Sequence, residues 1–497
     1  MTLSLSPQDA WQPLPAGDWN AEAARHLLRR AGWTARPAEV QRAAQEGLAL
    51  TLDRLFPPSP ALLPEPEMTQ RVEDDMPEFA AQYMQAAPED KRVLGRQQRE
   101  RWQAAYLDLS IRWLDFAAQP ENSAYQKWVL FLSDVYVVGF EKVRRTPLIY
   151  RHFDLLARHG LGPAPALSKA VSRSPAMVLY LDLAENRREA PNENFARELL
   201  ELFLLGEGNY TERDIKEAAR AFTGYRIRPP GDFVFAPRQH DPGLKTVFGH
   251  TGHLTGDDVI DLAYDLPAAG AYLPRKLTRF YLSDEMLPDP YLYALGGAWQ
   301  ASGYDLRWLA RAFFGSRLFF APEFRGNFIK SPVQFYLALL QDLDLDGVPL
   351  PRYVINPMRQ MGQVLFNPPN VRGWVGGRNW INSGSLAARR TLVESVFHPL
   401  NPESLNADEL RELAAAAAAR RGDFAVADER FGPLVALGPG AAVRAMAGDF
   451  LPVPAGPSFQ GSLETFIAGG RADPREHLRR VRRTLITILE SPAYQLC

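Results

Sequence analysis

Apolar residues recur every three or four positions over most of this chain, and that spacing constrains the fold more than any other feature. The stretches "NAEAARHLLRRAGW" and "GDDVIDLAYDL" both place their apolar side chains along one side of a helix. With 46% hydrophobic residues among 497, the chain can also bury a sizeable core. The sequence therefore predicts a mainly α, multi-helical globular fold.

One region breaks the helical pattern. The segments "YRIRPPGDFVFAPRQH" and "KTVFGH" carry β-branched and aromatic residues around turn-forming Pro and Gly. They predict one small β-hairpin insertion at about residues 225–249.

Changes in composition divide the chain into four predicted segments. Residues 1–60 carry the N-terminal helices, and the Pro-rich "PPSPALLPEPE" opens a linker and charged helical segment at 61–123. Residues 124–396 form a central helical core that includes the hairpin and a Gly- and Trp-rich loop at 367–383. Residues 397–497 form a C-terminal helical segment.

The most apolar stretch, residues 124–140, is predicted to be a buried central helix. It is too short for a membrane span and is interrupted by Lys127, Ser133 and Asp134. The N-terminus lacks the basic and apolar regions of a signal peptide. The expectation is a cytoplasmic protein with no transmembrane segment.

Charge and cysteine content narrow the functional classes. Fifty-six basic against 58 acidic residues give a formal charge of -2, so no global field favours nucleic acid. The single cysteine, Cys497, excludes internal disulfides and multi-cysteine metal sites. Its terminal position predicts an exposed thiol with no functional role. Partners and oligomeric state stay open.

Residues 192–225, "NENFARELLELFLLGEGNYTERDIKEAARAFTGY", start an apolar helical pattern with a cluster of charges. Glu193, Arg197 and Glu201 are four residues apart, so they share one stripe of a helix and can pair. Glu198 lies on an adjacent stripe. Two interpretations follow: a catalytic acid pair, or a capped helical hairpin with a charged edge.

The same segment carries helix-boundary signals. Asn192 is the predicted N-cap of the first helix, and the glycines of "GEGN" suit its C-terminal end. Thr211 with Asp214 predicts a capping box for the second helix. Because every charge has a structural role open to it, the residues alone favour the capped hairpin.

Histidines gather in "HDPGLKTVFGHTGH", which contains His240, Asp241, Lys245, His250 and His253. The three imidazoles, with a carboxylate, suggest a divalent metal such as zinc, although the spacing matches no strong zinc template. His240 beside Asp241 also suits a general base and its neighbour. The alternative is an ordinary Asp-Pro-Gly turn with solvated histidines.

The loop "NPPNVRGWVGGRNWINSGSLAARR" combines glycines with Asn370, Trp374, Arg378 and Trp380. Backbone N–H groups and arginines in such a loop can hold a phosphate or carboxylate, and its tryptophans can stack on a ring. The alternative, which we favour, is a rigid loop whose tryptophans fill the interior. Lys330, just before the helix start "SPVQF", could contact a carboxylate, but we expect a solvated cation.

Several ordered motifs resemble a known bacterial family. "PNENFARELLELFLLGEGNYTERDIKEAARAFTGY", "HDPGLKTVFG", "KSPVQF" and "MGQVLFNPPNVRGWVGGRNWINSGSLAARR" resemble the family called domain of unknown function 1800, over about residues 20–390. The resemblance implies no particular reaction. Family members carry an "FWHNHF"-like segment where this chain has "FLSDVY", so Ser133 and Val135 replace both histidines. If those histidines bind metal or transfer protons in relatives, that function is lost or altered here.

Two hypotheses remain. The first is a hydrolase whose cleft is lined by six candidate catalytic residues, namely Glu193, Glu198, Glu201, His240, Asp241 and Lys245. Candidate binding residues are Arg197, Lys330, Asn370, Trp374, Arg378 and Trp380. The second is a non-catalytic binding or assembly protein in which the same charges form a structural network. Convergence in an open pocket would favour the first hypothesis, and closed pairs the second.

Overall fold

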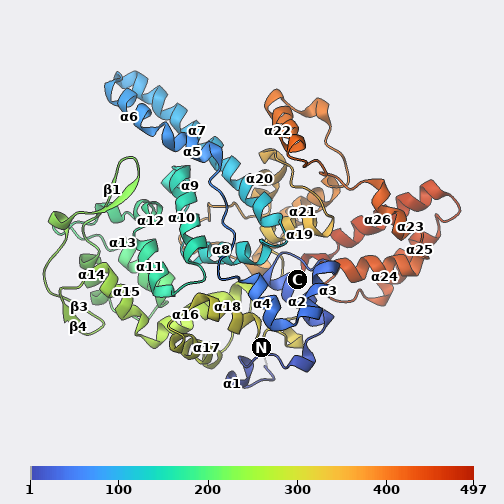
Figure 1. Cartoon of the computed structure of the whole chain (residues 1–497), viewed down its shortest axis with the longest axis horizontal. Helices are drawn as coiled ribbons and strands as arrows, with labels where there is room; N and C mark the ends of the chain where they lie inside the picture. The colour runs from blue at the N-terminus through green and yellow to red at the C-terminus, as the bar shows by residue number, and fades with distance from the viewer. Residues whose placement is uncertain (1–2) are drawn as a thin grey trace.

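The computed structural model describes residues 3–497, and helices make up most of it (Figure 1). The described residues contain two small antiparallel sheets, each of two strands. The predicted mainly α fold class is therefore confirmed. None of the helices within residues 3–497 has both the length and the apolar character needed to cross a membrane.

The N-terminal helices pack beside the centre of the molecule. They are α1 (Pro7–Ala10), α2 (Ala21–Ala31), α3 (Pro37–Glu46) and α4 (Leu48–Leu55). Asn20 caps α2, because its side chain accepts the backbone N–H groups of Glu22 and Ala23. Gly47 adopts a φ of 83° and so turns the chain between α3 and α4.

The charged segment forms a projecting arm. Its helices are α5 (Glu67–Asp74), α6 (Met76–Gln85) and the 31-residue α7 (Pro88–Ala118). Figure 1 shows α6 and the start of α7 extending away from the rest of the molecule. The buried residues of α7 concentrate after Ala105, since its first half is rich in charge and its second half is apolar.

Helix α8 (Ser123–Val135) is the buried central helix that the sequence predicts, although it ends at Val135 and not at residue 140. Lys127 is buried within it, and its Nζ donates to the carbonyl oxygens of Arg30 (2.8 Å) and Gly32 (2.9 Å). The lysine thereby satisfies acceptors at the end of α2. The helices that follow are α9 (Phe140–Val143), α10 (Thr146–His159), α11 (Ala164–Ser172) and α12 (Pro175–Tyr180).

The acidic motif folds as two helices joined by a short loop. The first is α13 (Asn194–Glu198), which continues as a π-helix (Leu199–Leu204), and the second is α14 (Glu212–Ala221). The predicted capping box of Thr211 and Asp214 is confirmed. The predicted N-cap Asn192 lies one position too early, because Glu193 occupies the cap and Asn192 Oδ1 accepts the N–H of Asn194 at 2.9 Å.

Two hairpins follow α14, where the sequence predicts one. Strands β1 (Tyr225–Arg228) and β2 (Asp232–Phe235) pair with Tyr225 opposite Phe235. Strands β3 (Lys245–Val247) and β4 (His250–Gly252) pair with Lys245 opposite Gly252. A short 3-10 turn (Pro237–Gln239) and the Asp-Pro-Gly turn separate them, so no ladder joins β2 to β3.

The chain then returns to helices. They are α15 (Gly256–Tyr264), α16 (Pro267–Tyr281), α17 (Asp289–Ala301), α18 (Leu306–Phe314), α19 (Pro332–Asp342), α20 (Pro351–Gln360) and α21 (Ser383–Ser395). Ser331 caps α19 with Pro332 in its first turn, as "SPVQF" predicts.

The C-terminal helices lie on one side of the molecule (Figure 1). They are α22 (Ala407–Ala418), α23 (Gly432–Val435), α24 (Pro439–Phe450), α25 (Pro457–Ala468) and α26 (Pro474–Glu490). The prediction of an exposed Cys497 is wrong, since the residue is only 1% exposed. Its N–H donates to the carbonyl of Phe328, which folds the chain end back against the body.

Helices α16 and α17 approach closely through two glycines. A Cβ at Gly296 would lie against the backbone of Gly270, closer than real side chains approach, whereas a Cβ at the adjacent Gly297 would meet nothing within 4 Å. We expect Gly296→Ala to lower the free energy of unfolding by about 2–3 kcal/mol through forced separation of the helices. Gly297→Ala should raise it by about 0.5–1 kcal/mol because alanine restricts the unfolded chain. Urea denaturation of both variants measures the contrast, and equal effects would contradict the close packing.

Candidate functional site

Arg197 joins the two helices of the acidic motif. Its guanidinium donates to both carboxylate oxygens of Glu212 on α14, at 2.9 and 2.8 Å, and to Glu193 at 3.1 Å. The bidentate geometry is the favoured one for an arginine and a carboxylate. Glu193 and Arg197 therefore act together to fix α13 against α14.

Glu201 does not share one face of the helix with Glu193 and Arg197, although the spacing predicts that it does. Its Oε1 accepts a hydrogen bond from Arg372 at 2.9 Å, and its Oε2 accepts one from the Tyr210 hydroxyl at 3.0 Å. Arg372 also contacts Glu207 at 3.2 Å. The π-helix explains the change, because its wider turn rotates Glu201 away from Arg197. The pairing of Arg197 with Glu201 that the spacing predicts does not form among the described residues.

Glu198 differs from its neighbours. Its half-buried carboxylate has no hydrogen bond or ion pair among residues 3–497. Burial, and next the charge of Glu201, raises the pKa of Glu198, while Arg372 opposes the rise. Such a carboxylate holds its proton to higher pH than an ordinary glutamate.

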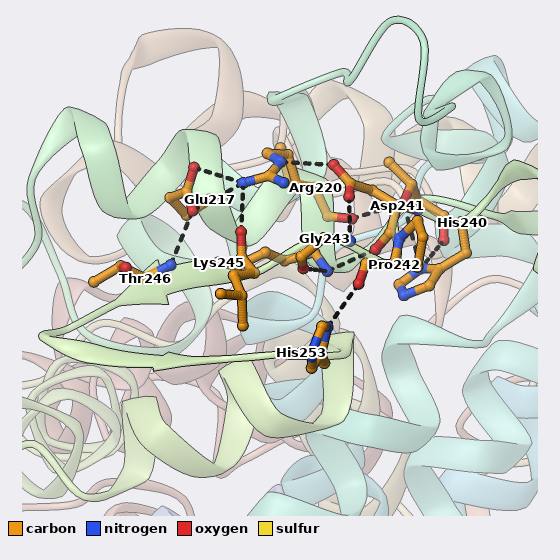
Figure 2. Close-up of polar contacts among 12 residues, drawn as sticks. Glu217, Arg220, His240, Asp241, Pro242, Gly243, Lys245, Thr246 and His253 are labelled. Atoms are coloured by element: carbon orange, nitrogen blue, oxygen red, sulfur yellow. Dashed lines mark hydrogen bonds and ion pairs between the residues drawn. The ribbon is translucent and has the colours of Figure 1, made fainter.

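The histidine segment forms a second group of contacts, drawn in Figure 2. Arg220 on α14 donates to Asp241 at 2.6 Å and to both oxygens of Glu217 at 3.0 Å. Asp241 Oδ1 also accepts the N–H of Gly243 at 2.8 Å. The hydrogen bond from Arg220 holds the pKa of Asp241 below its usual range. Asp241 is thus held as a carboxylate that closes its own turn.

Lys245 and His240 complete this group (Figure 2). The Lys245 ammonium, almost fully buried, donates to the carbonyl oxygens of Asp241 (2.6 Å) and Gly243 (3.1 Å), and burial lowers its pKa. His240 Nδ1 lies 3.0 Å from the carbonyl oxygen of Thr223. A carbonyl only accepts, so Nδ1 carries a hydrogen in this contact.

The three histidines do not gather around one point. His253 Nδ1 contacts the carbonyl of Pro242 at 2.7 Å, while His250 lies exposed on β4. Across the described residues, no group of three or more His, Cys, Asp or Glu side chains is arranged to hold a metal ion. The structure thus brings Asp241 and Lys245 together, whereas His253 contacts only the backbone of the adjoining turn at Pro242 and His250 lies exposed.

The Gly- and Trp-rich loop binds carboxylates that belong to the chain itself. Asp134 Oδ1 accepts the backbone N–H of Trp374 at 2.8 Å, and Asp284 accepts that of Arg378. Side chains at Gly373 and Gly377 would overlap these two carboxylates. The predicted anion-binding amides therefore exist, and aspartates from α8 and from the segment after α16 occupy them.

The tryptophans of the loop point inward. Trp374 and Trp380 are buried, and the indole N–H of Trp374 has no acceptor within the described chain. Asn370 is exposed, and its side chain accepts the N–H of Arg372 at 2.9 Å. The arrangement matches a rigid loop that fills the interior.

Lys330 is buried, contrary to the expectation of a solvated cation. Its Nζ lies 3.5 Å from the centroid of the Tyr494 ring, and burial lowers its pKa to about 8. The neighbouring Arg389 donates to the Lys330 carbonyl at 2.8 Å and to Gln495 at 3.1 Å. These cations tie α19 and α21 to the chain end.

Sequence reasoning missed Asp134 and Lys276. Burial raises the pKa of Asp134 to about 6 and lowers that of Lys276, and the two charges favour each other. Lys276 also lies near Arg372, next to the acidic motif. The sequence did contain a signal for Asp134, because an ionisable side chain within the most apolar stretch indicates a buried charge with a specific partner.

A comparison with protein families gives one match. The model of the family described as "Protein of unknown function (DUF1800)" matches residues 26–496, so the similarity extends through the C-terminal helices. No curated protein and no solved structure matches the chain.

Proposed function

The chain belongs to the DUF1800 family of proteins of unknown function, and from that premise we propose a non-catalytic binding or assembly protein. In this proposal the charged motif residues form a structural network that fixes helices and loops.

The pairing of the motif charges supports the proposal. Among the six candidate catalytic side chains, all but Glu198 have a hydrogen-bonding partner within the protein. These hydrogen bonds form two separate groups of side chains. One group lies at the junction of α13 and α14, and the other lies at the start of β3. None of the six lines the cavity of about 460 Å³ that lies elsewhere in the molecule.

Asp241→Asn tests the structural role. Because the change weakens the contact with Arg220, we expect the free energy of unfolding to fall by about 1–3 kcal/mol. Glu189→Gln is the matched control, since its contact with Arg188 is exposed and should change stability by less than about 0.5 kcal/mol. Urea denaturation measures both.

Activity assays challenge the same proposal. Wild-type protein is incubated with ester, phosphoester, glycoside and peptide substrates, and its metal content is measured by plasma mass spectrometry. Turnover that His240→Gln abolishes without changing the thermal midpoint would overturn the non-catalytic proposal. A near-stoichiometric metal that His240→Ala removes would do the same.

A hydrolase is the second candidate, and Glu198 favours it. The carboxylate is unpaired among the described residues, its pKa is raised, and the positive charge of Arg372 lies close enough to act on it. In this version Glu198 is the general acid or base, and Arg372 stabilises developing negative charge. The substrate panel, repeated with Glu198→Gln across a pH series, tests that role.

A further inference from the structure

A pocket of about 460 Å³ lies between α2 and the C-terminal helices α24 and α25. Arg25, His26 and Arg29 line it from α2, and residues 451–455 contribute Leu, Pro, Val and Ala side chains on the opposite side. The volume lies within the range of about 300–1,000 Å³ typical of small-molecule sites.

The pocket is strongly basic. Four guanidinium groups and one side-chain carboxylate line it, and these residues are Arg25, Arg29, Arg325, Arg444 and Glu22. Arg325 lies 3.8 Å from Glu22, and Arg444 lies 3.9 Å from Glu464 outside the lining. His26 adds no charge near neutral pH, because burial and Arg30 lower its pKa to about 3. A ligand that fits this lining carries negative charge at one end and an apolar surface at the other.

The arginines of the pocket differ in how many of their N–H groups are already bound. Arg29 is held by the carbonyl oxygens of Leu451 (2.5 Å) and Asp449 (2.8 Å), and Arg325 by the carbonyl of Phe320 (3.2 Å). Arg25 is half-buried and makes no hydrogen bond or ion pair to any residue from 3 to 497. Its planar fork matches a phosphate group.

We propose that this pocket binds a small amphiphilic molecule with a phosphate head group, held by the guanidinium of Arg25 beside the positive charge of Arg29, and an apolar body against residues 451–455. The inference rests on the proposed binding function and supplies its ligand class. Phosphate is favoured over carboxylate because Arg25 has no ion pair among residues 3–497, and Arg29 beside it adds a second positive charge that suits the higher charge of a phosphate group.

Calorimetric titration of the full chain with n-octyl phosphate tests the proposal. Inorganic phosphate should bind more weakly because it leaves the apolar wall uncovered, and octanoate more weakly because it carries a single charge. Arg25→Gln should weaken octyl phosphate binding by about tenfold or more. Arg42→Gln, on the exposed face of α3, is the control and should leave the affinity unchanged.

A second variant tests whether octyl phosphate binds in this pocket. Gly448 lines it, and a Cβ there would meet nothing within 4 Å, so a side chain can begin at this position and the ring of Gly448→Phe should occupy space that the ligand needs. We expect Gly448→Phe to abolish binding and Gly448→Ala to retain it, with both variants folded by circular dichroism.

Several results would overturn the pocket proposal: no binding of octyl phosphate, binding that Gly448→Phe leaves unchanged, or octanoate binding as tightly. Turnover in the activity assays with octyl phosphate binding intact would overturn only the non-catalytic proposal. The two failures are therefore distinguishable.

Discussion

Arg30→Met should lower the free energy of unfolding by about 3–5 kcal/mol, the largest effect that we expect from one substitution in this protein. Arg30 is only 1% exposed. Its guanidinium donates to the carbonyl oxygens of Tyr281 (3.0 Å), Leu282 (3.2 Å) and Phe324 (2.5 Å). Methionine fills the space of the side-chain stem but leaves these acceptors without a donor.

The carbonyls that Arg30 joins explain the size of this effect. They lie at the end of α16 and beside the loop after α18, so one side chain fastens both to α2. Arg25→Met is the matched control on the same helix, because Arg25 holds no carbonyl within residues 3–497, and it should change stability by about 0.5 kcal/mol or less. Urea denaturation measures both. Equal stability of Arg30→Met and wild type would show that the carbonyls find other donors.

Acid should destabilise the wild-type protein through its buried His152, and His152→Gln should remove that dependence. His152 Nε2 lies 3.0 Å from the carbonyl oxygen of Tyr136, and Nδ1 lies 2.9 Å from the Ser174 hydroxyl. The carbonyl accepts from Nε2, which leaves Nδ1 to accept from Ser174. Burial lowers the pKa of His152 from 6.5 to about 4.

The direction in which stability changes with pH follows from proton binding to His152 in the folded and unfolded states. Between pH 6.5 and about 4, the unfolded chain takes up a proton at His152 that the folded protein does not, so stability falls with pH. One pKa unit corresponds to about 1.4 kcal/mol, so the contribution lost between pH 6.5 and 4.5 is about 2 kcal/mol. The penalty of His152→Gln at pH 7 should therefore shrink by about that amount at pH 4.5.

The comparison between variants is needed because other groups titrate in the same range. Burial raises the pKa of Asp134 to about 6, so that group stabilises the folded protein as the pH falls toward 4. Gly296→Ala is the control, since it lowers stability without removing a titratable group and its penalty should not depend on pH. A penalty of His152→Gln that is equally large at pH 7 and pH 4.5 would contradict a neutral, buried His152.

Local signals in the sequence determined the secondary structure and several helix ends. Apolar spacing predicted the helices, Thr211 with Asp214 predicted a capping box, and Ser331 with Pro332 marked the start of α19. These features depend on residues within one or two turns, so their physical cause is present in the sequence itself. The same locality explains why the pairing of Glu193 with Arg197, four residues apart, could be expected from the sequence.

Only the tertiary structure decided which groups meet. Glu201 pairs with Arg372 and not with Arg197, because the π-helix changes the direction of its side chain. Asp134 meets the loop N–H of Trp374, 240 residues later in the chain. The basic pocket brings together α2 and the segment after α24, where Arg29 donates to the carbonyl of Leu451, 422 residues away. Side-chain pattern within a segment specifies a helix and its buried face, but the partner of that face depends on how all the segments pack together.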